Sequence, residues 1–351
     1  MEATMLAAHL TGHGGNEVVA VGAYPKPVRR PGEVLVRMRA ASVNRVDLYM
    51  RDSGAGITHT LPQVMGVDGA GIVEAVDDDE PLLKVGQPVV LYPGVTCGRC
   101  EFCRRGDAVL CTQMKLLGEH RDGTWAQWVS VPAANALPMP AHLDFAEAAA
   151  LGVNHLTAWR MLFTQARLQP WETVLIFGIG GGVSLAALQL ARMAGARTLV
   201  TSRDEGKLQR ALALGADHAI HSAGQDVAKA VLALTGGRGV DVVIENVGAA
   251  VWGAALKSLV RGGRIVTCGA TSGDQPGADL RRLFIRQLQV FGSTLGNPGE
   301  FADLLHAVAT NRLEPVIDSR FGLAEAHDAL ARLESERQFG KVVLTLPGDD
   351  R

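Results

Sequence analysis

Residues 172–196 read ETVLIFGIGGGVSLAALQLARMAGA and join an apolar strand-like run, a glycine-rich turn and a helix-like segment. This order is typical of a dinucleotide site, because glycines let the backbone approach a pyrophosphate and the helix N-terminus offers unpaired N–H groups with a positive dipole. Ser184 takes the place that often holds a third glycine, and serine is small enough for close helix–strand packing. The turn supplies five predicted cofactor contacts: Gly178, Gly180, Gly181, Gly182 and Val183.

The same alternation continues along the chain from about Trp171. Further apolar strand-like runs cover 197–202, 218–222, 240–248, 263–270 and 288–294, and helix-like segments between them cover 184–196, 204–216, 226–236 and 250–260. Near-continuous apolar strands that alternate with amphipathic helices indicate an α/β fold, with a parallel sheet covered on both faces. We therefore predict a doubly wound, Rossmann-type domain over residues 136–298.

The remaining sequence has a different rhythm. Up to about Pro132, short strand-like runs (33–44, 69–76, 88–95 and 124–132) are separated by Gly/Pro turns, which suggests a partly closed β-barrel. After Pro298 come a helix, a strand, another helix and the closing strand 340–346. This tail is too short to form a domain alone, so we predict that residues 299–351 pack back onto residues 1–135.

Within the first domain, residues 97–111 read CGRCEFCRRGDAVLC. Four thiolates this close in sequence can converge on one tetrahedral ion, and closed four-cysteine sites are typical of structural zinc. An iron–sulfur cluster is the alternative, although no second cluster motif accompanies it. A closed site leaves no position for water or substrate, so this metal should do no chemistry. We predict one Zn²⁺ per chain in a lobe over residues 95–113, held by Cys97, Cys100, Cys103 and Cys111. The fifth cysteine, Cys268, is interpreted as a small buried strand residue.

Composition limits the classes of function. A chain of 351 residues with 47% hydrophobic residues suggests about two domains with proper cores. The formal net charge of −2 gives no footprint for nucleic acid or an anionic membrane. No apolar run reaches the roughly 20 residues of a membrane span. The start, MEATMLAAHL, lacks the features of a signal peptide, so we expect reduced thiols and a cytoplasmic location.

Cofactor choice depends on the end of the second strand of the α/β segment, TSRDEGK. An NAD-preferring site usually places an acidic residue there to bind the ribose 2′-hydroxyl. This chain offers Ser202, Arg203 and Lys207, whose hydroxyl and cationic groups suit a 2′-phosphate. Asp204 is interpreted as a helix N-cap. We therefore expect NADPH, with NADH as the alternative.

Taken together, these features resemble the zinc-containing medium-chain dehydrogenase/reductase superfamily, which is alcohol dehydrogenase-like and pairs a GroES-like domain with a Rossmann domain. The likeness covers nearly the whole chain, including FGKVVL (339–344), and is greatest to the quinone oxidoreductase-like branch. Alcohol dehydrogenases of the superfamily also hold a catalytic zinc, whose ligand positions match Asn44, Val67, Asp68 and the region near Asn154. Asparagine and valine cannot replace thiolate and imidazole around zinc, so we expect none there. His120 and His155 are interpreted as hydrogen-bonded structural residues.

The resemblance also implies site residues. The segment NRVDLYMR is similar to the N-x-x-D-x-Y segment of quinone oxidoreductases, which places Asn44 and Asp47 beside the nicotinamide or ribose, Tyr49 facing the substrate and Arg51 assisting. Turn chemistry for Asn44 and Asp47, and a core-packed strand or loop aromatic for Tyr49, are the alternatives. By the same resemblance, further cofactor contacts are Thr157, Asn246, Gly269, Ser293, Thr294, Gly340 and Lys341.

Three functions follow as competing hypotheses. The first is an NADPH-dependent reductase of quinones or α,β-unsaturated carbonyls that uses no catalytic zinc. The second is an alcohol dehydrogenase or carbonyl reductase of a small alcohol or aldehyde, which acts without a catalytic zinc or recruits an unrecognised metal site. The third is a non-catalytic NADPH-binding redox sensor. A small molecule is the expected substrate. The resemblance implies a homodimer through the edge strand 288–294, with tetramers as a further assembly.

Overall fold

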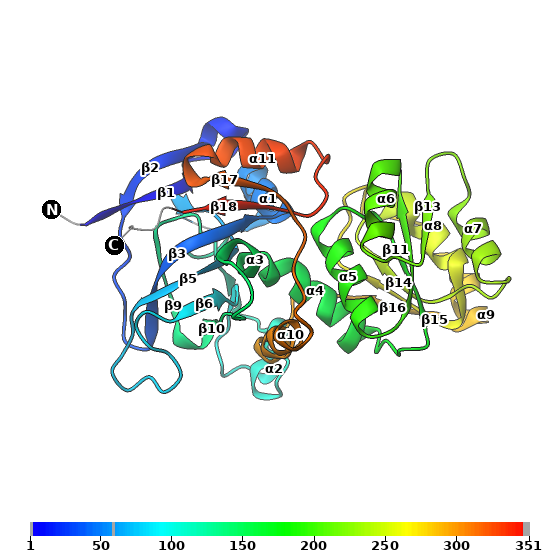
Figure 1. Cartoon of the computed structure of the whole chain (residues 1–351), viewed down its shortest axis with the longest axis horizontal. Coiled ribbons are helices and arrows are strands. Elements are labelled where there is room, and N and C mark those ends of the chain that lie inside the picture. Colours follow the sequence, from blue (N-terminus) through cyan, green and yellow to red (C-terminus); the bar gives the residue numbers. More distant parts are fainter. Residues whose placement is uncertain (1–2, 58–59, 347–351) are drawn as a thin grey trace. The chain divides into compact units, whose positions relative to one another are not determined.

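The computed structural model describes residues 3–57 and 60–346, and six of its strands form one parallel sheet in the order β13-β12-β11-β14-β15-β16 (Figure 1). The strands are β11 (Thr173–Ile176), β12 (Arg197–Ser202), β13 (His218–His221), β14 (Val240–Glu245), β15 (Leu259–Thr267) and β16 (Gln289–Gly292). In sequence order this is 3-2-1-4-5-6, the arrangement of a dinucleotide-binding doubly wound sheet. The predicted α/β class and Rossmann-type sheet are confirmed.

Helices connect these strands and cover them. They are α5 (Gly182–Met193), α6 (Glu205–Ala213), α7 (Val227–Leu234), α8 (Ala249–Ser258) and α9 (Leu280–Arg286). Four of them follow the predicted helical segments. Leu175 on β11, Val243 on β14 and Leu256 on α8 belong to one buried apolar cluster. Because each buried side chain of this size contributes about 1.5–3 kcal/mol, the layers are held by the apolar runs that identify the strands in the sequence.

In the rest of the described chain the strands pair antiparallel, apart from one parallel pair. Its strands are β1 (Thr4–Leu10), β2 (Val19–Pro25), β3 (Glu33–Val43), β4 (Gln63–Val64), β5 (Asp68–Ala75), β6 (Pro88–Leu91), β7 (Gly94–Val95), β8 (Lys115–Leu116), β9 (Trp128–Pro132), β10 (Ala136–Pro138), β17 (Ile317–Gly322) and β18 (Lys341–Thr345). β3 is central, since it pairs with β5, β9 and β18. β17 lies parallel to β18, and β1 pairs with both β2 and β4.

Outside the parallel-sheet segment the described residues form six α-helices, several of which are short. They are α1 (Arg45–Ser53), α2 (Glu101–Arg104), α3 (Phe145–Ala149), α4 (Leu156–Trp159), α10 (Pro298–Asn311) and α11 (Ala326–Glu334). Two π-helical turns, η5 (Leu151–His155) and η6 (Arg160–Gln165), flank α4. Short 3₁₀ turns are η1 (Asn16–Val18), η2 (Gly54–Gly56), η3 (Ala108–Leu110), η4 (Ala133–Asn135) and η7 (Leu323–Glu325). Across the residues that the structure describes, no helix is long and apolar enough to cross a membrane.

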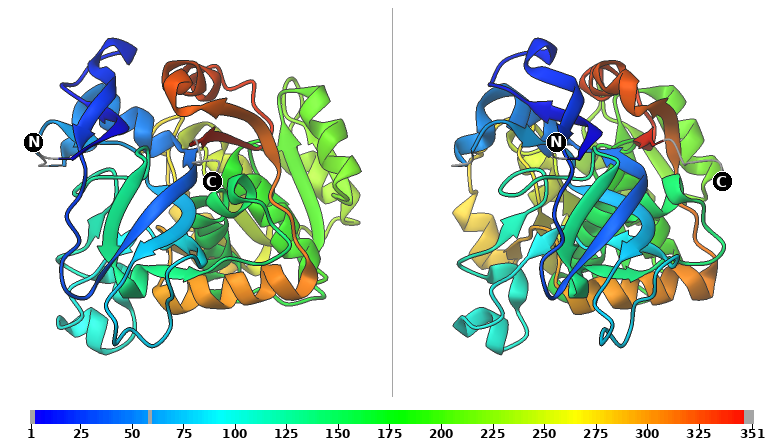
Figure 2. Two further views of the ribbon diagram at one scale, coloured as in Figure 1. Left: turned by 60° about the vertical axis from the view of Figure 1, so that its left-hand side comes forward. Right: turned by 90° about the vertical axis from the view of Figure 1, so that its left-hand side faces the viewer.

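The C-terminal strand returns to the N-terminal sheet. Val342 of β18 pairs with Val43 of β3, and Figures 1 and 2 show the red C-terminal strand beside the blue β3. Contacts divide the chain into a first unit, Met1–Val153 with Asn297–Arg351, and a second unit, Asn154–Gly296. These boundaries differ from the predicted 135 and 298, and residues 347–351 of the predicted C-terminal segment lie outside the described residues.

Candidate functional site

The glycine-rich turn joins β11 to α5 in the second unit. Gly178 and Gly180 have φ values of 66° and 112°, a left-handed region that L side chains rarely adopt. Gly181 is the N-cap of α5. At Gly182 a Cβ atom would lie 2.6 Å from side-chain atoms of Asn154, so a larger residue would have to displace that side chain. Val183 follows in the first turn of α5. The turn therefore presents bare backbone at a helix N-terminus, which suits a pyrophosphate.

Ser184 occupies the position that often holds a third glycine, and its hydroxyl group is hydrogen-bonded there. Its Oγ donates to the Phe177 carbonyl at 2.9 Å and accepts from Asn246 Nδ2 at 3.0 Å. The fully buried hydroxyl thus ties α5 to the end of β11 and to the end of β14. Asn246, a predicted cofactor contact, is held at the edge of the turn by this bond.

The end of β12 brings a cation to the same turn. Ser202 Oγ accepts the backbone N–H of Asp204 at 3.0 Å, and Asp204 Oδ1 accepts that of Lys207 at 3.0 Å, which confirms Asp204 as the N-cap of α6. The Lys207 side chain lies against Gly180, where a Cβ would be 2.8 Å from Lys207 Cδ. Arg203 is exposed between them. The Ser202 hydroxyl thus lies at the strand end, the Lys207 side chain lies against the turn, and Arg203 is exposed one residue after the strand.

The other predicted contacts of this unit follow neighbouring strands. Gly269 comes after β15, while Ser293 and Thr294 come after β16, so they share the carboxyl edge of the sheet with Gly178 and Asn246. Ser293 Oγ is buried and has no hydrogen-bond partner among the described residues. An unpaired buried hydroxyl at this edge fits a bound ligand. Thr157 is buried on α4.

The first unit holds a buried polar network centred on Asp68. Its Oδ2 accepts from Ser42 Oγ at 2.8 Å and from Asn44 Nδ2 at 2.9 Å, and its Oδ1 accepts from the Val153 backbone N–H at 2.7 Å. The side chain is 0% exposed. Burial raises the pKa of Asp68, while the Lys341 charge and these hydrogen bonds lower it.

Lys341 supplies the positive charge of this network. Its Nζ donates to Asn44 Oδ1 at 2.6 Å and to the Val43 carbonyl at 3.0 Å, and lies 3.9 Å from Asp68 Oδ2. Burial lowers the pKa of Lys341 to about 8, against the opposing effect of Asp68 and Asp47. The structure thus places this predicted cofactor contact against Asn44. Gly340, with a φ of 119°, precedes it.

Asp47 lies beside this network at the start of α1. Its Oδ2 accepts the Asn44 backbone N–H at 2.7 Å in a capping box. Burial raises the pKa of Asp47 to about 8; the Asn44 hydrogen bond opposes this, and the negative charge of Asp68 adds to it. Glu119, whose pKa burial raises to about 7, also repels Asp47. Sequence reasoning missed Glu119, which carries no motif.

Two residues of the predicted catalytic segment lie outside the network. Tyr49 is 43% exposed on α1, so it is a helical residue rather than a strand or loop aromatic packed in the core. Arg51 is buried and pairs with Asp52 at 2.6 Å and Glu334 at 3.0 Å. The pair with Glu334 fastens α1 to α11, so Arg51 is engaged in holding the fold.

The positions that match a catalytic zinc have an unsuitable donor set. Val67 is buried and apolar, and Asn44 and Asp68 are already bonded to each other. His120 Nδ1 bonds to the Leu116 backbone N–H at 3.2 Å, and His155 Nε2 lies 3.2 Å from Gln189 Oε1, so both histidines are hydrogen-bonded as predicted.

The four cysteines of the lobe converge. Their sulfur atoms lie within 4.8 Å of one another, and they form the one group of three or more potential metal ligands in residues 3–57 and 60–346. Zinc–sulfur bonds of about 2.3 Å in a tetrahedron require sulfurs about 3.8 Å apart. Cys97 and Cys103 are 4.0 Å apart, and Cys100 and Cys103 are 3.5 Å apart. The donor set therefore fits structural zinc. Cys268 lies apart, half-buried after β15.

Comparison with known proteins agrees with both units. A family model described as "Alcohol dehydrogenase GroES-like domain" matches residues 30–141, and one described as "Zinc-binding dehydrogenase" matches residues 182–310. An NAD-dependent alcohol dehydrogenase of Saccharolobus solfataricus is 30% identical over 91% of this chain and 94% of its own. A crystal structure of an NAD-dependent alcohol dehydrogenase is 40% identical, with a TM-score of 0.94 over 98% of this chain and 100% of its own. A cobalt- and zinc-bound thermostable alcohol dehydrogenase from Pyrobaculum aerophilum is 30% identical, with a TM-score of 0.88 over 98% and 100%.

Proposed function

Because the chain belongs to the zinc-type medium-chain dehydrogenase/reductase superfamily, we propose that it transfers hydride from NADPH to a quinone or an α,β-unsaturated carbonyl without a catalytic zinc. The coarser activity, that of a nicotinamide-dependent oxidoreductase acting on a small molecule, agrees with the relatives.

One observation carries the zinc-free proposal: a lysine ammonium occupies the network that contains Asn44 and Asp68, two of the positions that match catalytic-zinc ligands in the superfamily's alcohol dehydrogenases. Lys341 is 4% exposed and is held by Asn44, the Val43 carbonyl and Asp68. A cation held by these oxygen atoms would repel Zn²⁺. Val67 offers no lone pair in place of imidazole. Polarisation of the substrate must then come from hydrogen-bond donors rather than a Lewis acid.

The proposed preference for NADPH rests on the end of β12. Asp204 caps α6, so the carboxylate nearest the strand end already accepts a backbone hydrogen bond. Lys207 lies against the glycine-rich turn, and Arg203 is exposed one residue after β12. A 2′-phosphate could bind both cations. A ribose 2′-hydroxyl, by contrast, is usually bound by an acidic residue at the strand end, where this chain has Ser202 and Arg203.

When NADPH is bound, its nicotinamide supplies the hydride. Reduction of an enone or quinone leaves an enolate or hydroquinone anion, which needs a hydrogen-bond donor and then a proton. Tyr49 is proposed as that donor, because it is the exposed phenol on the helix that Asn44 and Asp47 cap. The neighbouring network of Asn44, Asp68 and Lys341 would fix the start of this helix and so the position of Tyr49.

A substrate panel tests this proposal. Purified protein would be mixed with NADPH or NADH and with quinones, enones, enoyl thioesters, aldehydes and alcohols, and cofactor absorbance would be followed. We expect oxidation of NADPH by quinones or enones, one zinc per chain by elemental analysis, and full activity after mild chelation. Tyr49→Phe should lower kcat at least tenfold, while Tyr24→Phe, a matched phenol on β2, should stay within twofold.

The second candidate is an alcohol dehydrogenase or carbonyl reductase, which the names of the relatives favour. It predicts turnover of alcohols or aldehydes and none of enones, and it would displace the first proposal if observed. Binding of NADPH without turnover of any member of the panel would instead support the non-catalytic sensor.

We also propose a homodimer. Large apolar side chains are exposed on α9 and on β16, the edge strand of the parallel sheet: Leu280, Phe284, Ile285 and Val290. An exposed strand edge with neighbouring apolar side chains invites pairing with a second copy.

A further inference from the structure

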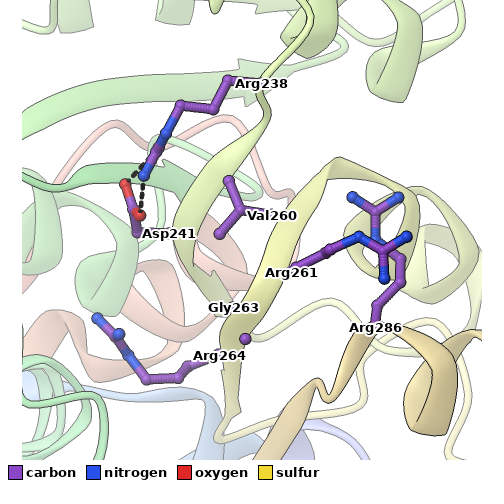
Figure 3. A pocket seen from close by; sticks show the side chains of 8 residues that line it. Arg238, Asp241, Val260, Arg261, Gly263, Arg264 and Arg286 are labelled. Atoms are coloured by element: carbon purple, nitrogen blue, oxygen red, sulfur yellow. Dashed lines mark hydrogen bonds and ion pairs between the residues drawn. The ribbon is translucent and has the colours of Figure 1, made fainter.

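A basic pocket of about 530 Å³ lies in the second unit, away from the glycine-rich turn. Figure 3 shows its lining: arginine side chains from the loop before β14, from β15 and from α9 surround one hollow. The residues that matter for the argument are Arg238, Asp241, Arg261, Gly263, Arg264 and Arg286. We call this the arginine pocket.

Two of the four arginines are neutralised by carboxylates. Arg238 pairs with Asp241 through bonds of 2.6 and 2.9 Å, and Arg264 pairs with Glu172 at 2.5 Å. Each of these two carboxylates therefore has its charge balanced by one arginine. Among the described residues that line the pocket, Asp241 is the one acidic side chain, and Glu172 reaches Arg264 from outside this lining.

The other two arginines lack a counter-charge. Arg261 donates to the Ile285 carbonyl at 3.1 Å and Arg286 to the Leu259 carbonyl at 3.1 Å, and neither forms an ion pair within the described part of the chain. The four guanidinium groups and two carboxylates therefore sum to a charge of about +2. Burial lowers the pKa of Arg286, and repulsion from Arg282 and Arg261 lowers it further. The arginine pocket therefore carries positive charge that no side chain of its own balances.

Unpaired donors point to the same conclusion. The Nε atoms of Arg264 and Arg286 are buried and have no hydrogen-bond partner among the described residues. Buried donors without partners are rare in native proteins, and each is costly. An anion in the pocket could accept from several guanidinium groups at once.

The backbone of β15 makes room for such a ligand. Val240 pairs with Leu259 and Val242 pairs with Arg264, so residues 260–263 leave the ladder between these pairs. Within this excursion Gly262 has a φ of 72°, and open space surrounds the position where its Cβ would be. The hollow is thus built by an irregularity of the strand and is within the size range of small-ligand sites.

The arginine pocket is separate from the predicted nucleotide site. Asp241 and Arg261 lie near the amino ends of β14 and β15, whereas the glycine-rich turn follows the carboxyl end of β11. Because all six strands are parallel, these ends lie at opposite edges of the sheet.

We propose that the arginine pocket binds a small molecule that carries a dianionic phosphate group, at a second site independent of the cofactor. Two uncompensated guanidinium charges match the two charges of a phosphate monoester near neutral pH. The planar donors of Arg261 and Arg286 provide several hydrogen bonds to its oxygens. The volume leaves room for a small organic group beyond the phosphate.

Calorimetric titration at low ionic strength tests the proposal, with inorganic phosphate and phenyl phosphate as separate probes. The protein is first saturated with its nicotinamide cofactor, so that the glycine-rich turn is filled. We expect one saturable site per chain. Tighter binding of phenyl phosphate would identify a phosphorylated organic ligand, and equal binding would identify the free ion as sufficient.

Variants locate the site. Arg261→Gln and Arg286→Gln should each weaken binding about tenfold, since each removes a charge-assisted hydrogen bond to the phosphate. Arg281→Gln removes the same charge from an exposed position on α9 outside the pocket and should change affinity less than twofold. Absence of saturable binding, or equal loss in all three variants, would overturn the proposal.

A partner subunit could instead fill the arginine pocket with its own acidic side chains. Light scattering of Arg261→Gln distinguishes this outcome. Loss of the dimer mass together with unchanged phosphate binding would overturn the small-ligand proposal, whereas an unchanged mass with weakened phosphate binding supports it.

Discussion

Replacing Asp47 by asparagine should remove a pH dependence from the free energy of unfolding of the first unit. Asp47 is buried at the start of α1, where its Oδ2 accepts the Asn44 N–H at 2.7 Å. Burial raises the pKa of this carboxyl from 3.8 to about 8. An asparagine side chain has nearly the same shape, and its amide oxygen can accept the same bond. Asp47→Asn therefore tests the proton rather than the packing.

The sign follows from the two pKa values. Between pH 3.8 and about 8 the folded protein keeps a proton on Asp47 that the unfolded chain has released. The native state then binds more protons, so stability is greatest at low pH and falls as the pH rises through this interval. One proton corresponds to about 1.4 kcal/mol per pH unit, or about 3 kcal/mol between pH 5 and pH 7. Between pH 5 and pH 7 the free energy of unfolding of the parent should therefore fall by about 3 kcal/mol more than that of Asp47→Asn.

Urea unfolding at pH 5, 6 and 7 measures the difference, with tryptophan fluorescence as the signal because Trp125 is fully buried in the first unit. Asp78→Asn, an exposed carboxyl outside the network, controls for the loss of one charge. The quantity to compare is the gap between variant and parent at each pH. A gap that stays constant from pH 5 to pH 7 would refute the burial-driven shift of Asp47.

Three further predictions concern other parts of the chain. Cys100→Ser should lose its zinc in elemental analysis and have a lower Tm, while activity per folded, cofactor-bound site survives. Cys268→Ser, the control, should keep its zinc. A fall in activity of several orders of magnitude in a folded Cys100→Ser variant would show that the metal is catalytic. Arg203→Ala should raise KM for NADPH about tenfold, since a charge-assisted bond to phosphate is worth about 1.5–3 kcal/mol, and should leave KM for NADH nearly unchanged. Equal effects on both cofactors would exclude Arg203 from the phosphate site. Phe284→Glu should convert the expected dimer to a monomer in light scattering, and a monomeric parent at micromolar concentration would contradict the proposed interface.

The parallel sheet could be predicted from the sequence because each of its strands has a recognisable sequence pattern. Runs such as TVLI in β11 and VDVVIE in β14 are buried throughout, so their apolar composition is nearly continuous. The connecting helices have apolar stripes, and glycines mark the turns. Each of these signals is local, and a short window of sequence contains all of it.

The polar network could not be predicted in this way. α1 buries Asp47 and Arg51 together with Leu48 and Met50, so its pattern does not separate a polar face from an apolar one. Arg51 is tolerated inside because Glu334, 283 residues later in the chain, pairs with it. Partners at such sequence distances leave no trace in a local pattern. Resemblance singled out Asn44 and Asp47 but gave no reason for their burial.

The pairing of the C-terminal strand with β3 explains why the positive charge of Lys341 lies in the network around Asp68. β18 pairs with β3 so that Val342 faces Val43, and one step along the antiparallel register brings Lys341 opposite Asn44. Side chains alternate between the faces of a strand, so a slip of one residue would turn Lys341 away and leave Asp68 buried without a cation. The returning C-terminal strand therefore does more than complete the sheet. It delivers the ammonium that lies beside Asn44 and Asp68, which links the zinc-free chemistry proposed for this protein to the topology of its fold.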